Sequence, residues 1–394
     1  MRTSNGPYSN GVDALTEALT PSGWRTHDAL RPGDHVLTMD PGEKRIRWSP
    51  ILGISRRDWN SWRDGELIQW DHRSVSALTA PGHRWMEQND QGRKRGDNRP
   101  HTWSTTGDLI GRTWARLVFG GGTPSAFPNA SPHSDEFVEL LGWIVAEGCY
   151  PKPKGDGSWN HVSISQSERV NPEKTAQLRR LASHFTNLGY TFNEYKVRPD
   201  GVVPFYIGSD LGAEIRTALP DKQLPPLLIA SLTLAQAQIL YQALIDGDGN
   251  RHVGGGDYWI QVDQGRIDSF QMLAAMLASR TAQKTWDALN GVSRTTIYTR
   301  DGGTSGSTHP SPVDYVGVIW HPELSRSMAW AARRAGTTYW TGSPELTEPE
   351  AARSQSHRRI GRMNKISSSD RPPLSIESTA STSSTSPSRN SAPA

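Results

Sequence analysis

Two nine-residue segments constrain the fold of this chain more than any other feature. Residues 140–148 read LLGWIVAEG and residues 241–249 read YQALIDGDG. Each closes a stretch in which apolar residues recur at helical spacing, which predicts an amphipathic helix. Each has small residues four positions apart and ends in an acidic residue followed by glycine. The chain therefore carries two similar helix ends, separated by roughly 100 residues.

The small residues predict how the two helices pack. They are Gly142 and Ala146 in the first segment, and Ala243 and Gly247 in the second. Small side chains at this spacing let two helix backbones approach closely. Side-by-side packing would bring Glu147 and Asp248 together at one end of the helix pair.

Paired carboxylates at these positions indicate a metal site. A carboxylate at a helix C-terminus faces the negative end of the dipole, so a positive charge should compensate it. Oxygen ligands suit Mg²⁺ or Mn²⁺, and we expect Glu147, Gly148, Asp248 and Gly249 to form that site. Metal ions held this way activate water and stabilise the oxygens of a phosphodiester displacement. One carboxylate for each strand would suit cleavage of both strands of a duplex.

The pattern of helices and strands around these segments occurs twice. Helices are predicted at residues 134–148, 171–188, 233–249 and 267–282, and strands at 159–165, 192–207, 258–262 and 295–299. Because the order of helix, strands and helix repeats, we interpret residues 129–305 as one domain with two pseudo-symmetric halves.

The segments on either side of this domain have a different character. Residues 11–128 contain short β-like runs broken by turns, for example 34–40, 46–54, 66–72 and 74–79, and such runs return at 306–343. We therefore expect an α+β fold in which the repeated domain is inserted into a mostly β domain. Residues 1–10 are expected to be flexible, and residues 344–394, rich in Ser, Thr and Pro, to be disordered.

Composition excludes several classes of protein. The 43 basic and 40 acidic side chains leave a net charge of only +3, so a nucleic-acid surface must come from local clusters. Cys149 is the only cysteine, which excludes a disulfide framework and a Cys-rich zinc site. No apolar run has the length of a membrane span, and the N-terminus lacks a secretion signal. We expect a cytoplasmic protein without a membrane partner.

Basic residues near the predicted strands and loops are candidates for DNA contacts. They are Arg93, Lys94 and Arg95 on a probable loop, and Lys152, Lys154, Lys196 and Arg198 beside the strands of the first half. For the cluster at 93–95 a solvated loop explains the sequence equally well as a phosphate contact.

The two nonamers resemble the LAGLIDADG motif of homing endonucleases. The resemblance implies two half-units of αββαββα type in one monomeric chain. It also implies metal-dependent cleavage of double-stranded DNA in a phage or another mobile element, and hence the cytoplasm of a bacterial or phage-infected cell. The segment DKQLP at 221–225 is similar to the Lys-x-x-Pro element of intein-type members, which implies that Lys222 is catalytic. No second such lysine can be placed in the other half.

The flanking β segments resemble the Hint splicing domain of inteins. The similarity covers residues 17–41, 78–85 with His83, and 315–343. Splicing chemistry is expected to be lost, because Gly11 stands in place of the nucleophile, and Gly342 and Ser343 in place of the closing His-Asn pair. Without these partners, His83 is expected to be structural.

These observations predict a site-specific homing endonuclease that no longer splices. Two other classes stay open. A LAGLIDADG fold without activity would bind DNA as a regulator, with no cuts and with strong salt dependence. An autoprocessing Hint protein would give fragments of the chain after expression.

Overall fold

The computed structural model describes most of the chain from Asn10 to Ser343. The described residues are 10–72, 75–88, 101–112, 115–151, 160–251, 256–298, 302–304 (backbone only) and 310–343. All of them belong to one unit, Met1–Leu346. The predicted flexible segment 1–10, apart from Asn10, and the predicted disordered tail 344–394 lie outside the described residues.

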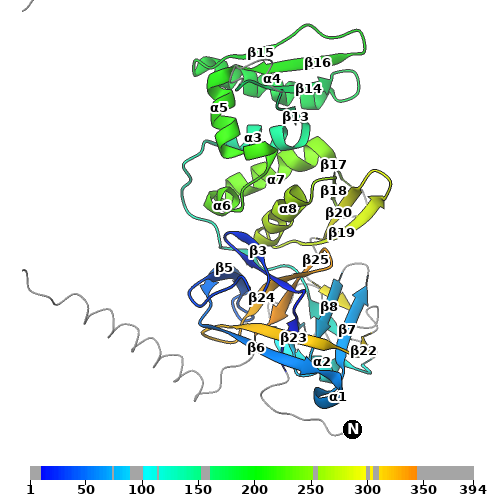
Figure 1. Ribbon diagram of the computed structural model, residues 1–394. Helices are drawn as coiled ribbons and strands as arrows, with labels where there is room; N and C mark the ends of the chain where they lie inside the picture. Colours follow the sequence, from blue (N-terminus) through cyan, green and yellow to red (C-terminus); the bar gives the residue numbers. More distant parts are fainter. Residues whose placement is uncertain are drawn as a thin grey trace, which may run out of the picture. The chain divides into compact units, whose positions relative to one another are not determined.

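Two helices, α3 (Asp135–Glu147) and α7 (Leu234–Asp248), lie side by side (Figure 1). The Ser134 side chain caps α3 by accepting from the Phe137 amide, and Thr233 forms a capping box with Gln236 at α7. The small residues meet where the sequence predicts. A Cβ on Gly142 would lie 2.6 Å from that of Ala243, and one on Gly247 would lie 2.3 Å from that of Ala146. The predicted close packing is confirmed.

Each helix begins one half of a structural repeat. The first half comprises α3, β13 (Gly148–Cys149), β14 (Val162–Ser167), α4 (Pro172–Asn187), β15 (Phe192–Glu194), β16 (Val202–Ile207) and α5 (Ser209–Ala218). A 3-10 turn, Pro220–Lys222, and α6 (Pro226–Ser231) lead to the second half. It comprises α7, β17 (Gly249–Asn250), β18 (Tyr258–Gln261), α8 (Gln264–Met276), β19 (Arg280–Asp287) and β20 (Val292–Tyr298). Strand order is equivalent in the halves, β13-β14-β16-β15 and β17-β18-β20-β19.

The second half departs from the expected αββαββα order. Among the described residues no third helix follows β20, whereas α5 completes the first half. Instead β19 pairs with β25 (Thr337–Gly342) through Ala282 and Thr337. The sheet of the second half thereby continues into strands from the flanking segments.

The flanking segments form a β-rich part together. Its N-terminal strands are β1 (Val12–Asp13), β2 (Glu17–Thr20), β3 (Gly23–Arg25), β4 (His35–Met39), β5 (Arg45–Pro50), β6 (Gly53–Asn60), β7 (Leu67–His72), β8 (Val75–Thr79), β9 (Arg84–Glu87), β10 (Thr102–Thr105), β11 (Arg116–Val118) and β12 (Thr123–Pro124). Short helices α1 (Ser61–Asp64) and α2 (Thr106–Leu109) interrupt them. Its C-terminal strands are β21 (Gly302–Thr304), β22 (Ser311–Val313), β23 (Val316–Glu323), β24 (Ala329–Arg334) and β25.

Strands from the two ends of the described chain alternate within these sheets. β23 lies between β1 and β6, β22 pairs with β7, and β24 pairs with β2 and β4. This mixed pairing means that the first and last β segments cannot separate without breaking sheets. The domain boundaries given above, and the likeness of this part to a Hint domain, stay predictions.

Arg333 joins the β-rich part to the second half of the repeat. Its guanidinium is buried and makes ion pairs with Glu17, at 2.6 Å, and with Asp268 of α8. It also lies 4.9 Å above the ring of Trp24, whose indole N–H donates to the Asp268 carbonyl at 3.2 Å. A buried, fully paired guanidinium fixes the geometry of both partners, because an unpaired charge here would carry a large desolvation penalty.

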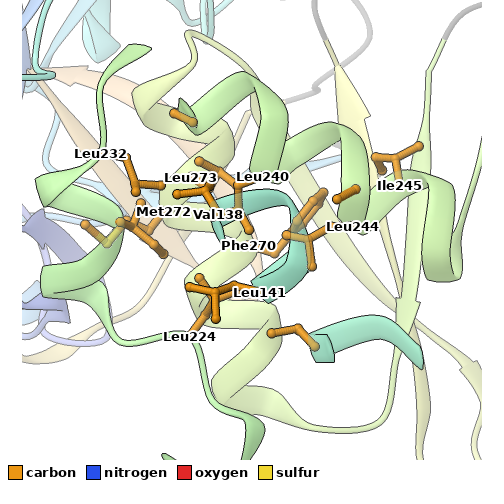
Figure 2. Close-up of a cluster of buried hydrophobic side chains, with 14 of the residues drawn as sticks. Val138, Leu141, Leu224, Leu232, Leu240, Leu244, Ile245, Phe270, Met272 and Leu273 are labelled. Carbon is orange, nitrogen blue, oxygen red and sulfur yellow. The ribbon is translucent and has the colours of Figure 1, made fainter. Parts of the chain in front are cut away.

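One apolar core fills the space around α3 and α7. Its members in Figure 2 include Val138 and Leu141 from α3, Leu240 and Leu244 from α7, and Leu273 from α8. All five side chains are almost completely buried. Apolar burial on this scale, at about 25 cal/mol per Å², is the main force that holds the two halves together.

The structure corrects several boundaries predicted from the sequence. The helix expected at 267–282 ends at Met276, and residues 280–287 form β19 instead. Ala278 adopts a left-handed conformation, with φ of 65°, and the Ser279 amide donates to the Ala274 carbonyl. This reversal ends the helix. The run at 46–54 is divided between β5 and β6, and α5 and α6 were not predicted.

Within the residues that the structure describes, no helix combines the length and the apolar character needed to cross a bilayer.

The α3–α7 contact leads to a stability prediction. Gly142→Val should lower the free energy of unfolding by about 1–3 kcal/mol or more, because its side chain would overlap Ala243. Urea denaturation followed by circular dichroism measures the change. Gln238→Val on exposed α7 surface is the matched control, since it introduces the same β-branched residue into a helix. Equal losses in both variants would contradict close packing at Gly142.

Candidate active site

Glu147 and Asp248 are the last residues of α3 and α7. Gly148 and Gly249 follow them in extended conformations, with φ of −73° and −101°. Glycine is required at both positions by space rather than by backbone angle. A Cβ there would lie 2.6 Å from the carbonyl oxygen of Ile144 or, in the second half, of Ile245. Each chain thus turns sharply out of its helix and leaves the carboxylate at the helix end.

The two carboxylates share one electrostatic environment. Burial raises the pKa of Asp248 to about 6, and the negative charge of Glu147 adds to this effect. Gln261 opposes it by donating from Nε2 to Asp248 Oδ2 at 2.6 Å, as do the charges of Lys222 and Lys174. The pKa is raised because the Asp248 carboxyl group is largely removed from solvent and lies near a second acidic group. The structure therefore brings together the two carboxylates that the sequence singled out.

Lys222 lies at this convergence. Its ammonium group donates to the carbonyl oxygen of Gly148. Burial lowers the pKa of Lys222, and Arg266 lowers it further, while Asp248 and Glu147 act in the opposite direction. Its backbone is strained, with φ of 60°, as is that of Asp221, with φ of 52°. Left-handed conformations of such residues cost about 1 kcal/mol or more and tend to occur where function requires them.

Lys174 was not singled out from the sequence. It lies in the first turn of α4, and its Nζ donates to the Gly247 carbonyl at 2.8 Å and lies 3.7 Å from Glu147 Oε1. The two lysines are arranged crosswise: Lys222, which precedes α7, contacts the end of α3, and Lys174, which follows α3, contacts the end of α7. The sequence did contain a signal for Lys174. A positive charge in the first turn of a helix is unfavourable, because it faces the positive end of the helix dipole, so a lysine there indicates a role other than stabilising the helix.

Two glutamines occupy equivalent positions in the halves. Gly148 pairs with Ile164 and Gly249 with Trp259, so Gln166 and Gln261 both lie two residues further along the second strand. Gln261 donates to Asp248, whereas the buried Nε2 of Gln166 has no hydrogen-bond partner among the described residues. Sequence reasoning missed this pair, since strand register determines it.

Arg266 is the counterpart of Lys174. Each is the third residue after its helix N-cap, Asn171 for α4 and Asp263 for α8. Arg266 lies close enough to Lys222 to lower the pKa of that lysine. Its buried Nε has no hydrogen-bond partner in the described part of the chain. Lys174 and Lys222 therefore lie beside the two carboxylates, and Arg266 lies near Lys222.

The residues of this site fit a divalent cation. No group of three or more His, Cys, Asp and Glu side chains converges within the described residues, so the two carboxylates would be the side-chain ligands of any cation bound here. Burial, and then the negative charge of Glu147, raise the pKa of Asp248, and a bound cation would oppose both effects by stabilising the ionised carboxylate. The Gly148 carbonyl, also expected in this site, accepts from Lys222 and would be a further hard ligand only after that lysine turned away.

The candidate DNA-binding residues are only partly described. Lys196 and Arg198 are exposed, between β15 and β16. Arg93, Lys94, Arg95, Lys152 and Lys154 lie outside the described residues. In the second half, β19 exposes Lys284 and Trp286, and Arg294 of β20 lies 4.4 Å above the Trp286 ring. These residues were missed because neither a helix nor a strand was predicted between residues 282 and 295.

The positions expected to have lost splicing activity also converge. His83 is completely buried; its Nδ1 lies 2.9 Å from Asn10 Oδ1, next to Gly11, and its Nε2 contacts the Thr341 hydroxyl, next to Gly342. Burial lowers the pKa of His83 to about 3, so the ring is neutral. Ser343 is buried, and its hydroxyl donates to the Met328 carbonyl at 2.9 Å.

Comparisons with known proteins complete this description. No protein-family model matches the chain, and no curated protein matches it. Among solved structures the chain is similar to the homing endonuclease I-DmoI, with a TM-score of 0.33 and coverage of 41% of this chain in each case. The match to I-DmoI in complex with DNA and Mn has 15% sequence identity and covers 89% of that chain. The match to the complex with DNA and Ca has 16% sequence identity and covers 82% of that chain. The match to mesophilic variants of I-DmoI has 15% sequence identity and covers 88% of that chain.

The pKa of Asp248 predicts how stability changes with pH in the absence of metal. The unfolded chain releases this proton near pH 3.8, whereas the folded protein keeps it to about pH 6. Stability should therefore fall as pH rises through this window, and the penalty should be complete above it. Asp248→Asn removes the charge and should raise the free energy of unfolding by about 1–3 kcal/mol at pH 7.5, with little change at pH 4. Urea denaturation in EDTA measures this.

Asp246→Asn is the control for that experiment, because it removes the same charge from the same helix but breaks an ion pair with Arg251 at 2.6 Å. It should give no gain at pH 7.5. An Asp248→Asn protein that is less stable than the parent at pH 7.5 would contradict the electrostatic description.

Proposed function

We propose that this protein is a site-specific endonuclease of the LAGLIDADG homing type, which makes double-strand breaks by metal-dependent hydrolysis of DNA. The observation that carries the proposal is the convergence of Glu147 and Asp248, from equivalent helices, beside the ammonium groups of Lys174 and Lys222. A structural role for this cluster would not explain two acids at helix C-termini and a lysine, Lys174, in a helix first turn, all against the local dipoles of a partly buried site.

The residues have complementary roles in the proposed reaction. Glu147 and Asp248 would hold Mg²⁺ or Mn²⁺, which supplies Lewis-acid stabilisation of phosphate oxygens and an acidified water. Lys174 and Lys222 would stabilise the charge that develops on each phosphate, because their Nζ atoms lie at the ends of the two helices. Gln261 orients Asp248 through its 2.6 Å hydrogen bond.

The two halves suit a duplex substrate. Each supplies one carboxylate and one four-stranded arrangement, so one site can act on each strand. Exposed cations on these strands, including Lys196, Arg198 and Lys284, would bind phosphates without reading sequence. The proposal includes a monomeric protein in the cytoplasm of a bacterial or phage-infected cell, a role in the mobility of a genetic element, and a Hint-like β-rich part that has lost splicing.

Cleavage of a plasmid library that carries randomised sites tests this function. In Mg²⁺ the protein should give discrete double-strand breaks, whereas Asp248→Asn and Glu147→Gln should lower the rate at least about a thousandfold. Asp246→Asn is the control and should retain activity. Tight, salt-dependent binding without cuts by the unmodified protein would contradict cleavage and favour a DNA-binding regulator.

The two lysines should affect the rate of cleavage rather than the binding of DNA. Lys174→Met and Lys222→Met should each lower the single-turnover rate by roughly 10–1000-fold, because each removes a positive charge that would stabilise the reacting phosphate. Lys196→Met, at an exposed position, should instead weaken binding and reduce its salt dependence. Single-turnover kinetics and filter binding at two salt concentrations separate these effects. An unchanged rate for both site variants would exclude them from the reaction.

A further inference from the structure

Asn10 precedes Gly11 in the chain, and its side chain contacts a buried histidine, His83. Asn10 is partly buried, and its Oδ1 lies 2.9 Å from Nδ1 of His83. The other ring nitrogen, Nε2, contacts the hydroxyl of Thr341. None of these residues belongs to the proposed endonuclease site.

The contacts determine where the histidine carries its proton. An amide oxygen accepts hydrogen bonds and cannot donate, so Nδ1 must carry the hydrogen and donate to Asn10. The ring is neutral, because burial lowers the pKa of His83 to about 3. Its Nε2 is therefore the acceptor and receives the proton of the Thr341 hydroxyl. The hydrogen bonds therefore run in one direction. Thr341 donates to His83, and His83 donates to the side-chain carbonyl oxygen of Asn10.

A donor in this position polarises the carbonyl toward attack at Cγ. The backbone nitrogen of Gly11, the next residue, is a nucleophile that reaches Cγ by closing a five-membered ring. Gly11 has no side chain to hinder that closure. Its lack of a side chain is also required by packing, because a Cβ would lie 3.3 Å from the backbone N and O of Trp320.

We propose that Asn10 is a self-modification site, at which Thr341 and His83 promote deamidation through a succinimide formed with Gly11. A bond forms between the Gly11 nitrogen and Asn10 Cγ, and the His83 N–H stabilises the oxyanion that develops on Oδ1. The Cγ–Nδ2 bond then breaks, and the proton from the Gly11 amide leaves with Nδ2 as ammonia. Water opens the succinimide and leaves aspartate or isoaspartate at position 10.

The same chain provides a comparison for this reaction. Asn290 also precedes glycine, in the exposed turn between β19 and β20, where its Nδ2 donates to Asp287 at 2.6 Å. No histidine contact is described for it. In the native protein Asn10 should therefore be modified faster than Asn290, by about tenfold or more if the donor acts as an oxyanion hole.

The full chain, incubated at neutral pH and digested, provides the test. Tandem mass spectrometry locates the mass gained when NH₂ is replaced by OH, and so separates Asn10 and Asn290 from Asn5, which also precedes a glycine. Thr341→Val, which is nearly isosteric, and His83→Leu should slow the reaction at Asn10 by about tenfold while the rate at Asn290 is unchanged. Unfolding the parent protein in urea should bring the two rates together without any substitution.

Three outcomes would overturn the proposal. Asn10 would be modified no faster than Asn290 in the native protein, or its rate would be unaffected by both substitutions. In the third, the chain would be cut and begin at Gly11, because that product requires attack by Nδ2 on the backbone carbonyl instead.

Discussion

The contact between α3 and α7 determines the position of every group in the candidate active site. Gly142 packs on Ala243 and Gly247 on Ala146, at distances that leave no space for a larger side chain on either glycine. This contact brings two helix C-termini together, and with them two carboxylates and two negative dipole ends. The arrangement is unfavourable by itself, which is why the surrounding cations matter. Lys174 contacts the Gly247 carbonyl and Lys222 the Gly148 carbonyl, so each lysine neutralises the end of the helix that does not belong to its own segment.

Charges placed against helix dipoles distinguish this site from ordinary surface ion pairs. Glu147 and Asp248 lie at C-termini, and Lys174 and Arg266 lie in first turns, so all four oppose the local dipole. The four positions alone would each favour the opposite charge. The same unfavourable charges occur at equivalent helix ends in the two halves. The stability of the individual helices does not explain this arrangement. Substrate phosphates and divalent cations, in contrast, require both signs of charge within one site.

The sequence predicted the helices and the paired carboxylates because these depend on local patterns. The spacing of apolar residues predicted α3 and α7, and the acid-Gly endings marked Glu147 and Asp248. Residues whose position depends on long-range register were missed. Gln166 and Gln261 are equivalent only because their strands pair in the same register with Gly148 and Gly249. The helix expected to reach residue 282 failed for a related reason. Its apolar run continues into β19, and only the left-handed Ala278 separates the two elements.

Packing in the β-rich part leaves no room for a side chain at Gly342, one of the positions where the sequence predicts lost splicing chemistry. A Cβ on Gly342 would lie 2.6 Å from the Arg84 carbonyl oxygen and from the Trp103 ring, so the surrounding chain has closed over the space that a side chain would need. Ser343 is held by hydrogen bonds with Met328 in both directions. Restoring a larger residue at Gly342 would therefore require the sheet to move, and that sheet continues through β25 into the second half of the repeat. The β-rich part therefore supports β19 and α8, through Thr337 and the buried Arg333. These contacts position the candidate active site and do not depend on any chemistry at Gly342 or Ser343.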